Sequence, residues 1–275
     1  MPILSNASVV INPPAPPARP YGLFDVYEPQ GLPRLEAEVG GITYQPDTCG
    51  FTRLWASECD PVTAKVFDSG VPTVDADPFI VYDSWLCGSI GYSVEEIAAR
   101  LRVRLTLKEQ RAVESRIWQG NSGLDITGLF TEATSLGTAG CAMEGVRMLE
   151  QALADNAIVG GAIHARSGMS AILSRDYLVF GETSPSRLRT TPLGTPYVFG
   201  QGYDGTGPAG QAPTSTSEWM YATGRILVWR GDEIDIPIRQ VLDRTTNEQY
   251  ALIERPYLAA IECGVWAVNV THGCA

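Results

Sequence analysis

A helical stripe that begins after Ser93 is the longest regular pattern in the sequence, and it constrains the fold more than any other feature. Its apolar side chains recur at helical spacing, at Val94, Ile97, Leu101 and Leu105, with Ala112, Val113 and Ile117 extending the stripe. Ser93 and Glu96 have the spacing of a capping box, and the pattern ends near Gln119. A helix over residues 93–119 would be about 40 Å long, which is typical of a structural spine.

The other patterns predict a mixed α+β protein with one large domain or two small ones. A second helix is expected over residues 141–156, with an apolar face made of Met143, Val146, Leu149 and Leu153. A short helix is expected over residues 167–173, and residues 121–140 and 176–218 are expected to be mostly loops and turns. Strands are expected at residues 78–82, 157–163, 197–199, 225–229, 234–238, 250–254 and 259–270.

The N-terminal region predicts an extended arm. Residues 12–20 read NPPAPPARP and hold five prolines. Proline fixes φ and has no backbone N–H group, so this stretch is unsuited to a helix or a central strand. An arm of this kind is ordered only when another surface holds it, and a neighbouring copy of the chain is the simplest candidate. Because the sequence starts with Met1, we expect that no N-terminal segment has been removed.

The region that follows the arm predicts a long two-stranded excursion. Residues 21–81 contain short strand patterns separated by turn signals, and the pieces at 41–44 and 63–67 alternate weakly between apolar and polar residues. The excursion has few large apolar residues and therefore little core of its own.

The charge of the chain argues against nucleic-acid binding over its whole surface. There are 31 acidic and 20 basic residues, which gives a net charge of −11, whereas phosphate contacts require many cations. One local basic patch remains compatible with this balance, and so does an acidic inner wall of a container for DNA. The sequence shows no secretory signal and no apolar run long enough to span a membrane.

The six cysteines do not form a recognisable framework. Cys49, Cys59, Cys87, Cys141, Cys263 and Cys274 are scattered, and neither His164 nor His272 lies at zinc-site spacing from a cysteine pair. We expect buried free thiols, and the alternative that Cys49 pairs with Cys59 across a hairpin stays open.

Motifs for catalysis are absent or incomplete. His164 and Ser167 would allow nucleophilic chemistry, but no oxyanion hole or orienting acid accompanies them. The glycine pair in residues 200–202 lacks the third glycine of a dinucleotide site and is interpreted as a turn. The acidic pairs at 232–233 and 95–96 are expected to be solvated. We therefore predict no enzymatic activity, no catalytic, cofactor-binding or metal-binding residues, and no cofactor.

The order of several segments resembles the major capsid protein family of tailed bacteriophages. A proline-containing strand leads into the spine helix, which ends in a glycine-rich turn at residues 117–129 (IWQGNSGLDITGL). Residues 157–173 (AIVGGAIHARSGMSAIL) look like the family's strand and short helix, and residues 193–198 (LGTPYV) look like a further strand. Residues 247–270 are similar to the closing pair of strands, although Pro256-Tyr257 interrupts the family's E-R-L-A pattern. The resemblance covers about residues 78–270.

Membership of this family implies the Hong Kong ninety-seven fold. By that analogy residues 1–30 form the N-terminal arm and residues 31–75 the E-loop hairpin. Residues 76–156 and 226–275 form the P-domain with the spine helix at about 93–119, and residues 157–225 form the A-domain. Some members crosslink a hairpin lysine to a neighbouring asparagine. Only Lys65 is placed to do so here, and no acid that would catalyse the reaction is identified, so we do not expect the crosslink.

The function implied by the resemblance is that of a major capsid protein. Copies would form the hexamers and pentamers of an icosahedral head that encloses DNA without sequence-specific binding. A separate scaffolding protein, a portal and decoration proteins are possible partners. The protein would be made in the bacterial cytoplasm and reside in the virion. Three alternatives stay open: an encapsulin-type shell that loads an enzyme cargo, a minor head or head–tail protein, and a hydrolase that uses His164.

Overall fold

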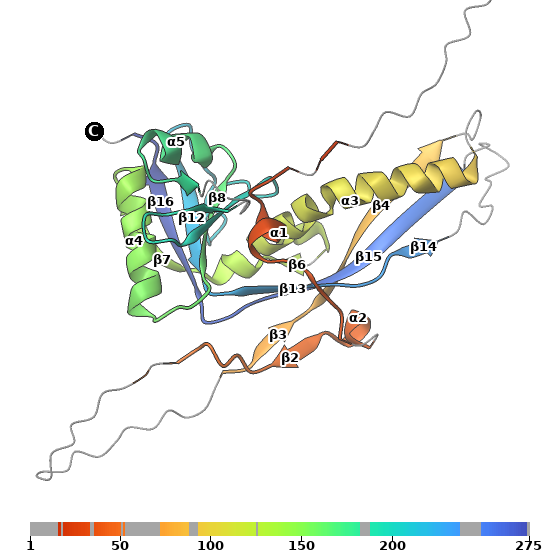
Figure 1. Cartoon of the computed structure of the whole chain (residues 1–275), viewed down its shortest axis with the longest axis horizontal. Helices are drawn as coiled ribbons and strands as arrows, with labels where there is room; N and C mark the ends of the chain where they lie inside the picture. The colour runs from red at the N-terminus through yellow and green to blue at the C-terminus, as the bar shows by residue number, and fades with distance from the viewer. Residues whose placement is uncertain are drawn as a thin grey trace, which may run out of the picture.

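The computed structural model describes residues 16–17, 19–33, 36–50, 52, 72–87, 93–124, 126–181, 188–236 and 249–273. In these residues a long helix, α3, lies along one large β-sheet and reaches a second one, and smaller helices cover the second sheet (Figure 1). This arrangement confirms the expected α+β class. Residues 1–15, the possible strand at 63–67 and Lys65 lie outside the described residues.

Helix α3 spans Val94–Trp118 and confirms the spine predicted from the apolar stripe. Ser93 Oγ accepts a hydrogen bond from Glu96 N at 3.1 Å, and Glu96 Oε2 accepts one from Ser93 N at 2.8 Å, which completes the capping box. The stripe is buried at Ile97, Leu101, Leu105, Val113 and Ile117. Ala112, however, is exposed, because the four-residue steps that lead from Leu105 to the buried Val113 and Ile117 leave position 112 beside the stripe.

A five-stranded sheet, here called the spine sheet, lies under α3. Its strands are β1 (Gln30–Gly31), β13 (Ile226–Arg230), β15 (Gln249–Ile261), β14 (Ile234–Ile236) and β4 (Pro78–Cys87). The long β15 is central: β4 pairs with one edge, and β13 and β14 share the other edge end to end. Side chains alternate between the two faces, so the buried Phe79 and Val81 lie on the face toward α3, while Ile80 and Tyr82 lie on the opposite face.

Pro256 lies inside β15 rather than interrupting it. It pairs opposite Ile80 of β4, and its carbonyl oxygen accepts a hydrogen bond from Gly231 N at 2.8 Å. The carbonyl and the missing N–H group of one residue point to the same edge of a strand. The missing donor therefore falls where β13 has ended and β14 has not begun. The sheet tolerates this proline for that reason.

The second large sheet has seven strands in the order β7 (Thr134–Ala139), β16 (Val265–Thr271), β12 (Ser217–Thr223), β8 (Ala162–Arg166), β11 (Pro196–Gly200), β10 (Arg189–Thr190) and β9 (Phe180–Gly181). Helices α4 (Ala142–Asp155) and α5 (Met169–Arg175) cover one face. Alternate residues of β12 separate the faces, because Met220 and Ala222 pack with these helices while Trp219 and Tyr221 pack on the other side. Residues 157–225 are the range expected for the A-domain, but strands β7 and β16 of this sheet lie outside that range. The expected domain boundaries stay a prediction.

Several local expectations were wrong. Residues 121–140 are not a loop throughout, since β7 pairs in parallel with β16. The strand expected at 157–163 starts at Ala162, because Ala157 and Gly160 have φ angles of +52° and +72° and form a turn. The apolar run at 259–270 is split between β15 and β16 by a turn at 262–264. Met143 of α4 is 54% exposed and does not belong to the helix's buried face.

The remaining elements are short. They are α1 (Leu23–Val26), α2 (Ala37–Gly40), β2 (Ile42–Tyr44), β3 (Val74–Ala76), β5 (Gly120–Asn121), η1 (Ser122–Leu124), β6 (Ile126–Thr127) and η2 (Leu129–Glu132). Strands β2 and β3 pair in antiparallel register and form the described base of the excursion at residues 42–76. This pairing agrees with the two-stranded excursion expected from the sequence.

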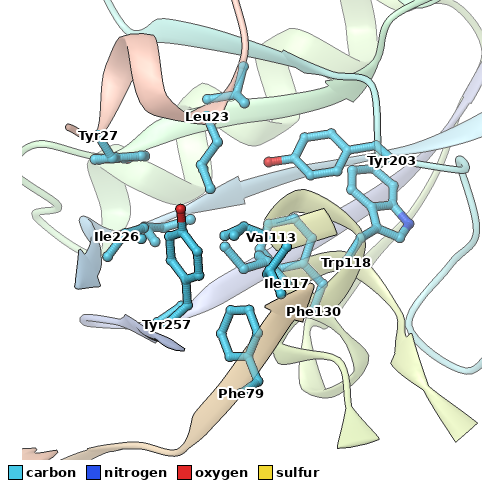
Figure 2. Packing of buried hydrophobic residues seen from close by; sticks show 14 of the residues in the cluster. Leu23, Tyr27, Phe79, Val113, Ile117, Trp118, Phe130, Tyr203, Ile226 and Tyr257 are labelled. Carbon is cyan, nitrogen blue, oxygen red and sulfur yellow. The ribbon is translucent and has the colours of Figure 1, made fainter. Parts of the chain in front are cut away.

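The main core lies where the C-terminal half of α3 meets both large sheets (Figure 2). Trp118 is 1% exposed, and its ring centroid lies 4.5 Å from that of Tyr203 and 4.6 Å from that of Tyr221. Phe130 of η2 and Leu23 of α1 complete this cluster and are fully buried. Aromatic packing of this kind joins the spine sheet, the seven-stranded sheet and the N-terminal segment into one body.

Candidate assembly surfaces

Glu114 is a buried carboxylate on α3 that binds two segments from distant parts of the chain. Its Oε1 accepts hydrogen bonds from Leu23 N and Gln110 Nε2, both at 3.0 Å, and its Oε2 accepts one from Gly202 N at 2.9 Å. Burial raises the pKa of Glu114, and these hydrogen bonds oppose that rise. One side chain therefore holds both the N-terminal segment and the loop after β11 against the spine helix.

The close approach of the loop after β11 to α3 explains Gly202. A Cβ atom on Gly202 would lie 2.2 Å from the backbone oxygen of Arg111. A Cβ atom on Gly22 would lie 1.5 Å from Gln110 Nε2, but this is the end of a flexible side chain, which can move aside. Glycine is required where a backbone comes this close to another backbone, as at Gly202. The glycine pair at residues 200–202 is thus explained by packing on α3.

Residues 21–27 pack on the body of the chain itself. Tyr21 O accepts a hydrogen bond from Phe199 N at 2.8 Å, and Tyr21 Oη accepts one from Arg189 Nη2 at 3.0 Å. Tyr27 Oη donates to Gly160 O at 3.2 Å. Beyond them, β1 pairs in parallel with β13. The described end of the expected arm is therefore fixed to the seven-stranded sheet and the spine sheet before the chain enters the excursion.

A partly buried ion-pair network centred on Glu109 connects α3 with the spine sheet. Glu109 is 3% exposed and pairs with Arg255 of β15 and, at 3.4 Å, with Arg230 of β13. Arg255 also reaches Glu233 at 3.3 Å, and Glu233 pairs with Arg102 at 2.6 Å. The expectation that the acidic pair at 232–233 is merely solvated was wrong for Glu233, because two arginines converge on it.

The excursion is fixed to the body through a disulfide. Cys49 bonds to Cys263, and their Cα atoms are 5.1 Å apart, a usual separation for such a bond. The expected free thiols are therefore wrong at these two positions, and Cys49 does not pair with Cys59. No local signal in the sequence points to this pair, since 214 positions separate its members.

The spine sheet leaves part of its outer face open. Tyr82, Glu254 and Ile234 are opposite one another across three strands, so their side chains share the face turned away from α3. Tyr82 is 64% exposed, and Ile234 and the neighbouring Ile80 are exposed as well. At the other end of this face, Ala76 of β3 packs with Leu258 of β15. We call the exposed residues Ile80, Tyr82 and Ile234 the open sheet face.

A second exposed apolar region lies in the segment that joins α5 to β11. Tyr177, Phe180 and Leu193 are exposed there, and Tyr177 adopts a φ of +56°. Single exposed apolar residues are ordinary on protein surfaces, and these three are a candidate contact site because they fall in one segment of the chain. We call these three residues the loop surface.

The structure places His164 where it is unsuited to catalysis. It is fully buried on β8, with Nδ1 2.9 Å from Tyr203 Oη and Nε2 2.9 Å from Thr223 Oγ1. Burial lowers the pKa of His164 to about 3, which keeps the ring neutral. Ser167 Oγ donates instead to the carbonyl oxygens of Phe199 and Gly200. The hypothetical His164–Ser167 pair is therefore not assembled, and His164 is a structural residue of the core.

Within the described ranges, no cluster of three or more histidine, cysteine, aspartate or glutamate side chains has the arrangement of a metal site. None of the helices described here is both long and apolar enough to cross a membrane.

Sequence reasoning missed the buried polar groups that join the elements. Glu109 lies four residues after Leu105 and four before Val113, inside the apolar stripe of α3. A carboxylate at such a position signals a buried cationic partner, because an unpaired charge there would be very costly. Its partner Arg255 could not have been identified in this way, since it lies on a distant strand.

No protein-family profile matches the chain, and no curated protein matches it. Solved structures do match along nearly its full length. The capsid of the empty GTA particle is 12% identical with a TM-score of 0.53, and the match covers 94% of this chain and 99% of that chain. The structure of Mycobacterium phage Ogopogo is 11% identical with a TM-score of 0.51, over 96% of both chains. The SrpI encapsulin of Synechococcus elongatus is 13% identical with a TM-score of 0.53, over 96% of this chain and 93% of that chain.

The matched chains come from capsids and from an encapsulin, and each match spans nearly the whole of both chains. The chain therefore has the Hong Kong ninety-seven capsid fold.

Proposed function

We propose that this chain is a subunit of a self-assembling protein shell and, more specifically, the major capsid protein of a tailed bacteriophage. Copies would form the hexamers and pentamers of an icosahedral head around a DNA genome. The observation that carries the proposal is the agreement in fold over nearly the whole length of both chains, 94% and 99% in the match to the empty GTA particle capsid. A match of this extent leaves little room for an additional catalytic domain in the described chain.

The expected division of the chain is part of this proposal. Residues 1–30 would be the arm, 31–75 the E-loop, 76–156 and 226–275 the P-domain, and 157–225 the A-domain. The contacts of residues 21–27 with the body and the antiparallel pairing of β2 with β3 support the first two assignments.

The exposed apolar residues support assembly. The open sheet face and the loop surface lie on different sheets. Contacts between two different surfaces of one chain are head-to-tail contacts, which generate closed rings when the rotation between copies closes. A stable contact buries about 800 Å² per partner, so Tyr82 and Tyr177 would each be only the centre of a larger interface.

The charge supports a container rather than a nucleic-acid-binding protein. At a net charge of −11, the subunit would repel packaged DNA over most of its surface, so that the genome is enclosed without adhering to the wall. A separate scaffolding protein, a portal and decoration proteins are the additional partners of this proposal. The subunit would be made in the bacterial cytoplasm and would reside in the virion.

An encapsulin-type nanocompartment shell is the second candidate. The match to the SrpI encapsulin has the same TM-score, 0.53, as the match to the empty GTA particle capsid. The contents of particles purified from their natural source distinguish the two. Nuclease-protected DNA favours the phage capsid, whereas a co-purifying enzyme without DNA favours the nanocompartment. A minor head protein would be present in such particles in few copies.

Negative-stain microscopy and size-exclusion chromatography of the purified chain test assembly directly. We expect closed particles tens of nanometres across. Tyr82→Asp should yield folded but unassembled subunits, because it places a charge in the open sheet face. Met143→Asp adds the same charge to an exposed apolar position on α4 and should still assemble. A wild-type chain that stays monomeric at high concentration would refute the shell proposal, and full assembly of Tyr82→Asp would remove the open sheet face from the interfaces.

A further inference from the structure

Cys263 lies at the junction of the two large sheets. It forms the turn between β15 of the spine sheet and β16 of the seven-stranded sheet, with a φ of +66°. Glu262 N donates to Arg225 O at 2.9 Å, and Gly224 N donates to Gly264 O at 3.1 Å. Residues 224–225 connect β12 of the seven-stranded sheet to β13 of the spine sheet. The chain therefore passes between the two sheets twice at this point, and Cys263 lies in one of the two connections.

Cys49 follows β2 in the excursion. The excursion is held on the spine sheet by apolar contacts as far as Tyr44, whose ring lies 5.8 Å from that of Trp229. Beyond that residue, Thr48 Oγ1 donates to Glu262 Oε2 at 2.8 Å, next to the Cys49–Cys263 bond. Thr48 Oγ1 also lies 3.5 Å from Cys263 Sγ, and Pro46 is buried. A few non-covalent contacts are a weak restraint on a chain segment. The covalent bond is therefore the strongest link that keeps residues 45–50 at the junction.

Solvent reaches both sulfur-bearing residues. Cys49 and Cys263 are each half-buried, and their Cα separation of 5.1 Å allows the bond to form without movement of the backbone. A thiol pair of this kind is accessible to small thiols and small disulfides, whereas a fully buried pair is protected from exchange.

We propose that Cys49 and Cys263 are an oxidative modification site whose co-reactant is a low-molecular-weight disulfide such as oxidised glutathione, and that its closure locks the excursion onto the junction between the two sheets. In a reducing compartment the two residues are thiols and residues 45–50 are released. In an oxidising medium the bond closes, and the excursion and both sheets become one covalently closed unit. This inference concerns the single subunit and goes beyond the shell proposal.

The reaction is ordinary thiol–disulfide exchange. One cysteine thiolate attacks a sulfur of oxidised glutathione, forms a mixed disulfide and releases one glutathione thiolate. The second cysteine thiolate then attacks the protein sulfur of the mixed disulfide and releases the second glutathione. Two protein thiols are oxidised, one oxidised glutathione is reduced to two thiols, and the two protons lost by the cysteines protonate the departing thiolates.

The test uses the full chain purified under reducing conditions and then incubated with oxidised glutathione. After the remaining thiols are alkylated, digestion and mass spectrometry should show a peptide that links Cys49 to Cys263. Amide hydrogen exchange at residues 45–50 should slow on oxidation. The unfolding temperature should rise by several degrees and by up to about 10 °C, because the bond closes a very long loop. Cys141→Ser should behave like the wild type, whereas Cys49→Ser should lose all three responses.

The proposal is overturned if Cys49 is instead linked to Cys59, or if the correct bond forms without any change in exchange at residues 45–50. Cys49→Ser supplies the permanently open form, and its far-ultraviolet circular dichroism reports whether it still folds. Because no step requires particles, failure of this test leaves the microscopy result untouched, and failure to assemble leaves the redox result interpretable.

Discussion

Replacing Glu114 by alanine should lower the free energy of unfolding by about 2 to 6 kcal/mol. The side chain is fully buried and accepts hydrogen bonds from the backbone N–H groups of Leu23 and Gly202, at 3.0 and 2.9 Å. Alanine leaves both donors buried without an acceptor, and each such donor costs about 1 to 3 kcal/mol. The N-terminal segment and the loop after β11 should therefore separate from α3 more readily in Glu114→Ala than in the wild type.

Glu114→Gln separates the contribution of shape from that of charge. Glutamine keeps one acceptor oxygen but turns an amide N–H group toward one of the two donors, so a smaller cost of about 1 to 3 kcal/mol is expected. Burial raises the pKa of Glu114 above its value in the unfolded chain. Its contribution to stability is thus complete below the unfolded pKa and is lost as the pH rises through the folded pKa. The difference in stability between wild type and Glu114→Gln should accordingly be largest in mild acid and shrink toward neutral pH.

Urea unfolding of unassembled subunits, followed by tryptophan fluorescence, measures these free energies. Hydrogen exchange at the amides of Leu23 and Gly202 shows whether the two segments have been released. Glu95→Ala removes an exposed carboxylate from the same helix and should change stability by only a few tenths of a kcal/mol. A loss below about 1 kcal/mol for Glu114→Ala, with both amides still protected, would refute the role assigned to this carboxylate.

Further variants probe the other buried groups. The pKa of His164 falls from 6.5 to about 3 on folding, so the unfolded chain binds more protons between these two values. The free energy of unfolding, measured with urea, should therefore be about 2 to 3 kcal/mol lower at pH 4.5 than at pH 7. The variant His164→Gln should show a smaller decrease. Arg255→Ala leaves the buried Glu109 with Arg230, which is partly exposed, as its remaining arginine partner and should cost up to about 3 to 5 kcal/mol, whereas the double variant with Glu109→Gln should recover part of this loss in the same assay. Gly202→Ala should lower the melting temperature, because its Cβ would meet a helix oxygen at 2.2 Å, while Gly168→Ala has open space and should not lower it.

Elements with local signals were predictable from the sequence. The spine helix was expected over residues 93–119 and spans Val94–Trp118, because its capping box and apolar stripe are both properties of neighbouring residues. Helix α4 was likewise expected over residues 141–156 and spans Ala142–Asp155. In both helices the errors concern single residues, Ala112 and Met143, at the border of the apolar face.

Elements that depend on distant partners were not predictable in the same way. Strand β7 (TSLGTA) has Leu136 as its one large apolar residue and shows no alternation of apolar and polar residues. It is a strand because β16 supplies its hydrogen-bonding edge. Strand β12 was overlooked because both of its faces are buried, which removes the alternation of apolar and polar residues. The Cys49–Cys263 bond belongs to the same class, since folding alone brings its two residues together.

Helix α3 carries two buried carboxylates, Glu109 and Glu114, although charged groups are costly to bury. Their contacts suggest a role in fixing the geometry between the two sheets. Glu109 binds arginines of the spine sheet, whereas Glu114, little more than one turn further along, binds the N-terminal segment and the loop that follows β11 of the seven-stranded sheet. Apolar contacts alone tolerate small rotations between packed layers, but hydrogen bonds and ion pairs have directional geometry. Two such groups in succession on one rigid helix fix the angle between the sheets. If the chain forms the shell proposed above, curvature accumulates from copy to copy, and a fixed angle within each copy then matters more than the stability that an all-apolar joint would add.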